Sequence, residues 1–171
     1  MKIWKYLVVI AALLATTQIV DAGDEPAWWD MANCDFCVNM SSAPGLMDAM
    51  QWESHKIADG SISMVQMDEA HLGTFKKACA GMKATQEKAM SGAEIQTCGM
   101  CSAMGRAMMA GANVETVDTS NGQIHIMTSD NAEVVEQLHM IVQRNQDEMK
   151  KMMAPAHDGH GHSHDGHSHG G

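Results

Sequence analysis

The sequence of 171 residues contains two diverged copies of one unit. The heptapeptide Cys34–Met40 matches Cys98–Met104, because both read Cys-x-x-Cys-x-x-Met, with an offset of 64 residues. Five further residues recur with an offset of 62: Glu53, Gly60, Ile62, Asp68 and Ala70 match Glu115, Gly122, Ile124, Asp130 and Ala132. One loop insertion or deletion explains the difference between the offsets. Because an internal repeat restricts a chain to folds built from similar units, the repeat predicts approximate two-fold symmetry.

Each copy has the same predicted order of elements, α-β-β-α. The pattern predicts cysteine-containing helical segments over 33–50 and 97–112, strands over 51–58 and 113–120, return strands over 61–67 and 123–128, and long helices over 69–90 and 131–153. Asp59-Gly60 and Asn121-Gly122 separate the strand pairs and predict hairpins with type I′ turns, which require positive φ. Asp68 and Asp130 stand where an N-cap is expected, and Ser91-Gly92 ends the first long helix.

Two hairpins from similar units are expected to pair, because a lone hairpin is marginally stable in water. We therefore predict one α+β domain with a pseudo-two-fold axis, a four-stranded antiparallel sheet and helices on one face. Two separate modules joined near 91–95 are the alternative. The predicted boundaries are a signal peptide over 1–22, an N-terminal segment over 23–32, repeats over 33–92 and 93–154, and a tail over 155–171.

The N-terminal segment is typical of a secretory signal peptide. Lys2 and Lys5 precede an apolar run over 6–15, and the sequence Val20-Asp21-Ala22 follows with small residues at the positions expected for cleavage. The apolar run is too short to span a bilayer, although an uncleaved anchor is the alternative. We expect a periplasmic or secreted mature protein with no membrane span, in a compartment where thiols oxidise unless a metal or a partner holds them.

The composition favours sulfur chemistry and excludes several classes of protein. From Gly23 onward there are 17 methionines but only 16 Leu, Ile and Val residues together. The formal net charge of −10 makes nucleic acid an unsuitable partner. The chain shows no Ser/His/Asp constellation, P-loop or dinucleotide fingerprint, so we expect a protein that is not an enzyme.

The paired cysteine segments predict a site for a soft metal. On a helix, residues at i, i+3 and i+6 lie within about 120° of one face. Thiolate and thioether ligands select Cu(I) over hard ions. The predicted ligands are Cys34, Cys37 and Met40 in the first copy, with Cys98, Cys101, Met104 and Met108 in the second.

Three other interpretations of the cysteines are open at this stage. Each pair could form a disulfide, the pairs could be redox-active, or all four thiolates could meet across the pseudo-axis as a Cys₄ zinc site. The zinc interpretation requires the fold to bring the pairs together, because 60 residues separate Cys37 from Cys98. Cys79 has no equivalent in the second copy and is predicted to be a buried, inert thiol.

The C-terminal segment predicts a second metal-binding region. It contains six histidines among Gly, Ser and Asp residues: His157, His160, His162, His164, His167 and His169. Such a tract cannot bury enough apolar surface to fold, and its imidazoles suit zinc, nickel or Cu(II). It resembles the His-rich tails of metal chaperones and metal-transport proteins. Binding should weaken below about pH 6, because imidazole must be neutral to bind a metal. A solvated tail without function is the alternative.

The order of cysteine–methionine cluster, hairpin and helix loosely resembles the copper chaperone of nitrous-oxide reductase assembly. The resemblance covers a handful of residues in each copy, and that family's lipid anchor is missing. We expect an exported copper chaperone or buffer whose partners are metal ions and a metal-accepting or thiol-reducing protein. An extracytoplasmic thiol–disulfide redox protein and a disulfide-stapled interaction domain are the alternatives.

Overall fold

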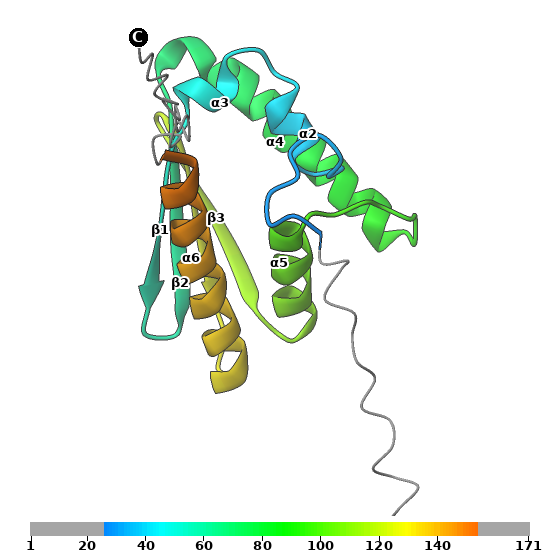
Figure 1. The fold of residues 1–171 in the computed structure, drawn as a ribbon, viewed down its shortest axis with the longest axis vertical. Helices are drawn as coiled ribbons and strands as arrows, with labels where there is room; N and C mark the ends of the chain where they lie inside the picture. The colour runs from blue at the N-terminus through cyan, green and yellow to red at the C-terminus, as the bar shows by residue number, and fades with distance from the viewer. Residues whose placement is uncertain (1–25, 154–171) are drawn as a thin grey trace, which may run out of the picture.

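The computed structural model describes residues 26–153 as an antiparallel sheet with helices packed on it (Figure 1). The elements are α2 (Val38–Ser41), α3 (Leu46–Ala49), β1 (Gln51–Ile57), β2 (Gly60–Gln66), α4 (Glu69–Met90), α5 (Gly99–Met109), β3 (Asn113–Thr119), β4 (Gly122–Thr128) and α6 (Ala132–Met153). The strand order β1-β2-β4-β3 joins the two hairpins through their return strands. The predicted α+β fold with a four-stranded antiparallel sheet is thereby confirmed. The predicted signal peptide and His-rich tail lie outside the described residues.

The strand register has the same two-fold symmetry as the sequence repeat. Ser63 of β2 pairs with His125 of β4, and these two positions are equivalent in the two copies. Both hairpins also close in the same register, because Ile57 pairs with Gly60 as Thr119 pairs with Gly122. The pseudo-two-fold axis therefore passes through the centre of the sheet, between β2 and β4.

The two hairpin glycines have a different role from the predicted one. In residues 26–153, positive φ occurs only at Gly45, Gly92 and Gly111, so the predicted type I′ turns are wrong. Gly60 and Gly122 instead begin β2 and β4. A Cβ on Gly60 would collide with the backbone carbonyl of Met127, and one on Gly122 with that of Val65. Glycine is needed there because two central strands approach each other closely.

The helix boundaries agree with the predictions for the long helices but differ at two places. Asp68 caps α4 by accepting a hydrogen bond from the backbone N–H of His71 at 3.0 Å, as predicted. The predicted cap at Asp130 is wrong, because Asn131 Oδ1 accepts from the N–H of Glu133 at 2.9 Å and α6 begins one residue later. The predicted helical segment over 33–50 consists of turns and two one-turn helices, interrupted at Gly45 with φ 72°.

The helices divide the core into three clusters of buried side chains. Helix α6, from the second copy, packs on β1 and β2 of the first copy (Figure 1). One cluster contains Trp28, Ala107, Met127, Leu138 and Ile141, and another contains Leu46, Val65, Met67, Phe75 and Ala78. The third cluster consists of Cys34, Cys37 and Cys98. Three of the four repeated cysteines are therefore core residues.

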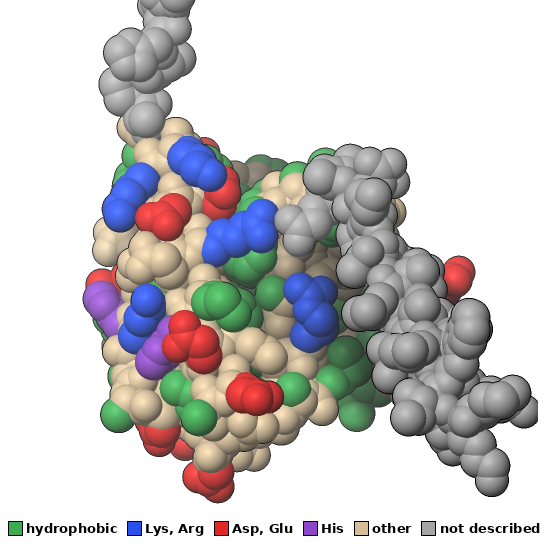
Figure 2. Space-filling model, turned by 60° about the horizontal axis from the view of Figure 1, so that its bottom comes forward, with side chains coloured by type: hydrophobic (Ala, Val, Ile, Leu, Met, Phe, Trp, Pro, Cys, Tyr) green, Lys and Arg blue, Asp and Glu red, His purple; other side chains and the backbone are tan. Residues whose placement is uncertain are grey.

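On the face shown in Figure 2, acidic and basic side chains are interspersed, and neither kind forms a large patch of one charge. No helix within residues 26–153 has both the length and the apolar character needed to cross a bilayer.

The substitution Asn145→Ala is expected to lower the free energy of unfolding by about 1–3 kcal/mol, because it leaves a buried donor without its partner. Trp28 is 8% exposed, Asn145 is 5% exposed, and the indole Nε1 donates to Asn145 Oδ1 at 2.7 Å. Urea denaturation would measure the change. Gln143→Ala, at an exposed position of the same helix, serves as the control and should change stability by less than about 0.5 kcal/mol. Equal stabilities for the two variants would contradict the assignment.

Candidate metal centre

Both cysteine pairs lie at the beginning of a helix. Cys98 is the N-cap residue of α5, and Cys101 lies in the first turn of that helix. Cys37 is the N-cap residue of the one-turn helix α2, and Cys34 lies in the preceding turn. The two pairs therefore belong to different copies of the repeat and reach the same place from different elements.

The four thiols of these pairs form a single group. Their Sγ atoms all lie within 4.8 Å of one another, and Cys37 Sγ lies 3.7 Å from both Cys98 Sγ and Cys101 Sγ. Four thiolates around one tetrahedral ion are roughly 3.8 Å apart when the metal–sulfur bond is about 2.3 Å. Cys34, Cys37 and Cys98 are buried, whereas Cys101 is partly exposed. The spacing and number of the sulfurs could hold a metal ion between the two copies.

The N-terminal segment holds the second pair in place. The N–H groups of Gly99 and Met100, at the start of α5, donate to the carbonyls of Ala27 and Trp28 at 3.0 Å each. These are donors that a helix leaves without an internal partner. The Cys34 N–H donates to the carbonyl of Asp30 at 3.1 Å. One short stretch of chain therefore connects the two cysteine pairs through its backbone.

The first pair is held by polar contacts around Asp35. The Asp35 N–H donates to the Gln96 carbonyl at 2.9 Å, and the Gln96 N–H donates to Asp35 Oδ2 at 2.8 Å. The Asp35 carbonyl accepts from the Asn39 amide at 2.9 Å and from the Thr85 hydroxyl of α4 at 3.4 Å. The loop that presents Cys34 and Cys37 is thus fixed to the loop that precedes Cys98. Such support fixes the geometry of ligands before a metal arrives.

The thiols of Cys37, Cys98 and Cys101 differ in pKa. A hydrogen bond from Cys101 lowers the pKa of Cys37 to about 6, against the effect of burial. The pKa of Cys101 is raised, chiefly because its proton is held in that hydrogen bond. Burial raises the pKa of Cys98, while backbone hydrogen bonds from Cys101 and Asp30 act in the opposite direction. Cys37 therefore ionises more readily than Cys98 and Cys101.

All five cysteines of the chain lie in the described residues, and all are free thiols. No pair is at disulfide-bonding distance, so the structure does not contain the disulfides considered above. Cys79 lies outside the group, where its Sγ donates to Gln123 Oε1 at 3.5 Å and burial raises its pKa. The structure thus separates four clustered thiols from a fifth thiol on α4.

Of the three predicted methionine ligands, two pack against other core clusters and one is exposed. Met40 packs against the cluster that contains Leu46, and Met104 packs against the cluster that contains Trp28. Met108 is 39% exposed. The four cysteines make a full tetrahedral set without these thioethers, so metal binding by the three methionines stays a prediction. The six predicted histidine ligands of the tail lie outside the described residues.

Met100 lies beside the cysteine group, although the sequence did not predict it as a ligand. It packs against the cysteine group, and its Sδ accepts a hydrogen bond from Trp29 Nε1 at 3.1 Å. The equivalent residue of the first copy, Phe36, packs against the same group. Both occupy the same position inside Cys-x-x-Cys, so the second variable residue of that motif was the available signal.

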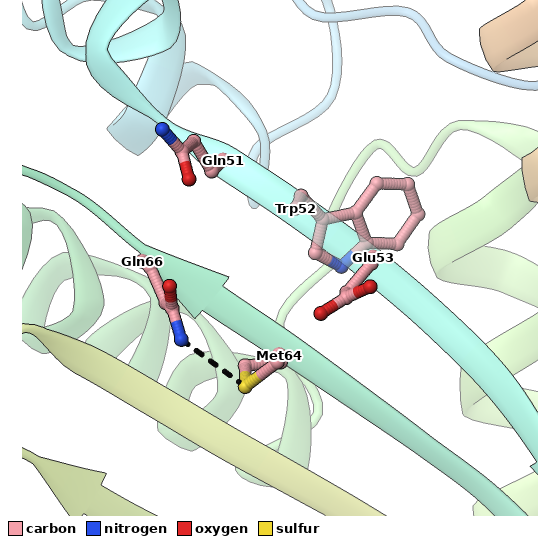
Figure 3. Close-up of a pocket in the computed structure, with 5 residues that line it drawn as sticks. All are labelled: Gln51, Trp52, Glu53, Met64 and Gln66. Atoms are coloured by element: carbon pink, nitrogen blue, oxygen red, sulfur yellow. Dashed lines mark hydrogen bonds between the residues drawn. The ribbon is translucent and has the colours of Figure 1, made fainter.

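A shallow pocket between β1 and β2 is a weaker candidate. Figure 3 shows Gln51, Glu53, Met64 and Gln66 on one side of the sheet, with Gln66 Nε2 donating to Met64 Sδ at 3.3 Å. The pocket includes one carboxylate and no cysteine. In residues 26–153, the four cysteines are the group of His, Cys, Asp and Glu side chains close enough to share an ion.

Comparison with protein-family models, curated proteins and solved structures finds no match to this chain. The fold and the site define the chain as an α+β protein with a largely buried four-cysteine centre.

Proposed function

We propose that this chain is an exported, non-enzymatic protein that holds Cu(I) at Cys34, Cys37, Cys98 and Cys101 and acts as a copper chaperone or buffer. The observation that carries the proposal is the convergence of the four Sγ atoms within 4.8 Å. Neither cysteine pair provides more than two thiolates alone, whereas the two copies together provide four.

The surroundings of the centre favour a soft ion. The side chains packed against the cysteine group include Met31, Phe36 and Met100, which are all apolar. Thiolates and thioethers are soft ligands, which suit Cu(I) as well as zinc and disfavour hard ions such as Mg²⁺ and Ca²⁺. The thioether of Met100 stands beside the thiols as an additional soft donor.

A structural zinc site is the second candidate, because one observation favours it directly. The two 3.7 Å sulfur–sulfur separations suit a closed tetrahedral set of four thiolates, which is the usual arrangement of structural zinc. Zinc in this position would connect the two copies of the repeat. In that case the ion would stabilise the fold and would not be passed to another protein.

We further propose that the His-rich tail captures divalent ions. Its six imidazoles follow α6 in the sequence, within residues 157–169. Cu(II), zinc and nickel all suit imidazole. We expect a metal-accepting or thiol-reducing protein as the partner in a periplasmic or extracellular compartment.

A competition titration tests the proposal. The mature chain, reduced and anaerobic, would be titrated with Cu(I) and with Zn(II) against calibrated chelators, beside a variant with all six tail histidines replaced by asparagine. We expect one high-affinity Cu(I) equivalent in both proteins, which Zn(II) in equal amount does not displace. Displacement of Cu(I) by Zn(II) would favour the structural zinc site. Turnover of a model disulfide that is lost on Cys→Ser substitution would favour the redox alternative.

A further inference from the structure

Helix α5 leads from the cysteine group towards the surface. Cys101 is the partly exposed member of the group, whereas the other three cysteines are buried. Any ion that enters or leaves without opening the core therefore passes Cys101. The residues that follow Cys101 on the same side of α5 determine what such an ion meets.

Two methionines occupy that side. Met104 and Met108 follow Cys101 at i+3 and i+7, so at 100° per residue Met108 lies within about 20° of Cys101 around the helix axis. With a rise of 1.5 Å per residue, the successive steps along the axis are about 4.5 Å and 6 Å. Met104 is partly buried and Met108 is 39% exposed. Met108 is thus the most exposed of the three residues.

We propose that Met104 and Met108 form a path for Cu(I) between solvent and Cys101. This inference rests on the proposed binding of Cu(I) by the four cysteines. Methionine suits this task because its side chain is flexible and its thioether is soft and uncharged. An uncharged donor binds more weakly than a thiolate, so the ion moves on to the cysteines.

The transfer is a ligand exchange without a change of oxidation state. The ion first forms a bond to Met108 Sδ as it leaves a ligand in solution. A bond to Met104 Sδ then forms and the bond to Met108 breaks. The Cys101 thiol finally loses its proton to water, its thiolate binds the ion, and the bond to Met104 breaks. Copper remains Cu(I) throughout, and release follows the same steps in reverse.

The test measures exchange rates separately from binding. The mature full-length chain would be loaded with one equivalent of Cu(I) under anaerobic conditions and mixed rapidly with excess bathocuproine disulfonate as the acceptor. In Met104→Leu/Met108→Leu the rate of transfer should fall about tenfold, which corresponds to one lost stabilising step of about 1.4 kcal/mol. The stoichiometry and equilibrium affinity should stay within about twofold of the wild type, because the cysteines are unchanged.

Met109→Leu is the matched control. Met109 is 83% exposed on the same helix but lies about 100° around the axis from Met108. It should exchange at the wild-type rate. Wild-type exchange by the double variant would overturn the path while leaving the four-cysteine site intact. Loss of its bound copper would also overturn the path, because Met104 and Met108 would then be ligands of the resting site. Failure of the wild-type protein to bind Cu(I) would overturn the proposed function and the path together.

Discussion

The double substitution Cys37→Ser/Cys101→Ser is expected to remove high-affinity binding of a thiophilic ion. It removes one sulfur from each copy, including both members of a 3.7 Å pair. Binding free energies of four-ligand zinc sites are on the order of 10–16 kcal/mol, so losing two ligands should cost about 5 kcal/mol or more. The affinity should therefore fall by more than about 10³-fold, as measured by competition with a chelator of known affinity.

Cys79→Ser is the matched control for this experiment. It removes a thiol from the same protein, but that thiol bonds to Gln123 and lies outside the group. Stoichiometry and affinity should remain those of the wild type. Equal loss in both variants, or full binding by the double variant, would contradict a single shared centre. Circular dichroism of the reduced, metal-free proteins would show whether each variant keeps its fold.

The second large effect is expected at the centre of the sheet. Gly60→Ala and Gly122→Ala should each lower the free energy of unfolding by more than about 3 kcal/mol, at the upper end for single substitutions. In both cases the added Cβ meets a backbone carbonyl of the neighbouring central strand, at Met127 or Val65. Because backbone cannot move aside as a flexible side chain can, β2 and β4 would have to separate. Thermal or urea denaturation would measure the loss.

Gly73→Ala provides the opposite control. Gly73 lies in α4, and a Cβ placed there meets nothing within 4 Å. Alanine should therefore stabilise the protein by about 0.5–1 kcal/mol, because it has the higher helix propensity. If all three alanine variants had similar stabilities, the close approach of the central strands would not be the reason for glycine.

The sequence repeat predicted most of the fold because it shows which residues occupy equivalent positions in the strands of the two copies. The offset of 62 places Ser63 and His125 at equivalent positions, and the structure pairs them. The long helices were predicted closely because α4 combines good helix formers with a capping Asp68. The hairpin glycines were misinterpreted because the pattern Asp-Gly does not distinguish a turn requirement from a steric one. Contact with Met127 depends on strand pairing between copies, which local sequence does not contain.

The sequence predicted the cysteines of the candidate site, but it did not predict that all four lie around one centre. The motifs identified all four thiols, whereas the 60 residues between Cys37 and Cys98 left one site or two equally consistent with the sequence. The expected helix over 33–50 also placed Met40 beside its cysteines. The chain instead forms turns around Cys34 and Cys37, and Met40, in α2, packs against the cluster of Leu46. Met100 accepts a hydrogen bond from Trp29, which lies 71 residues away in the sequence, and no motif spacing indicates such a contact.

X-ray absorption at the metal edge, combined with native mass spectrometry of the mature chain loaded with one equivalent of Cu(I), tests the shared centre most directly. A tail variant without its six histidines would remove the competing imidazole ligands. A shared four-cysteine centre predicts one ion per chain with only sulfur neighbours, supplied by both copies of the repeat. Two ions per chain, each held by one Cys-x-x-Cys pair, or a coordination shell dominated by nitrogen or oxygen, would contradict it.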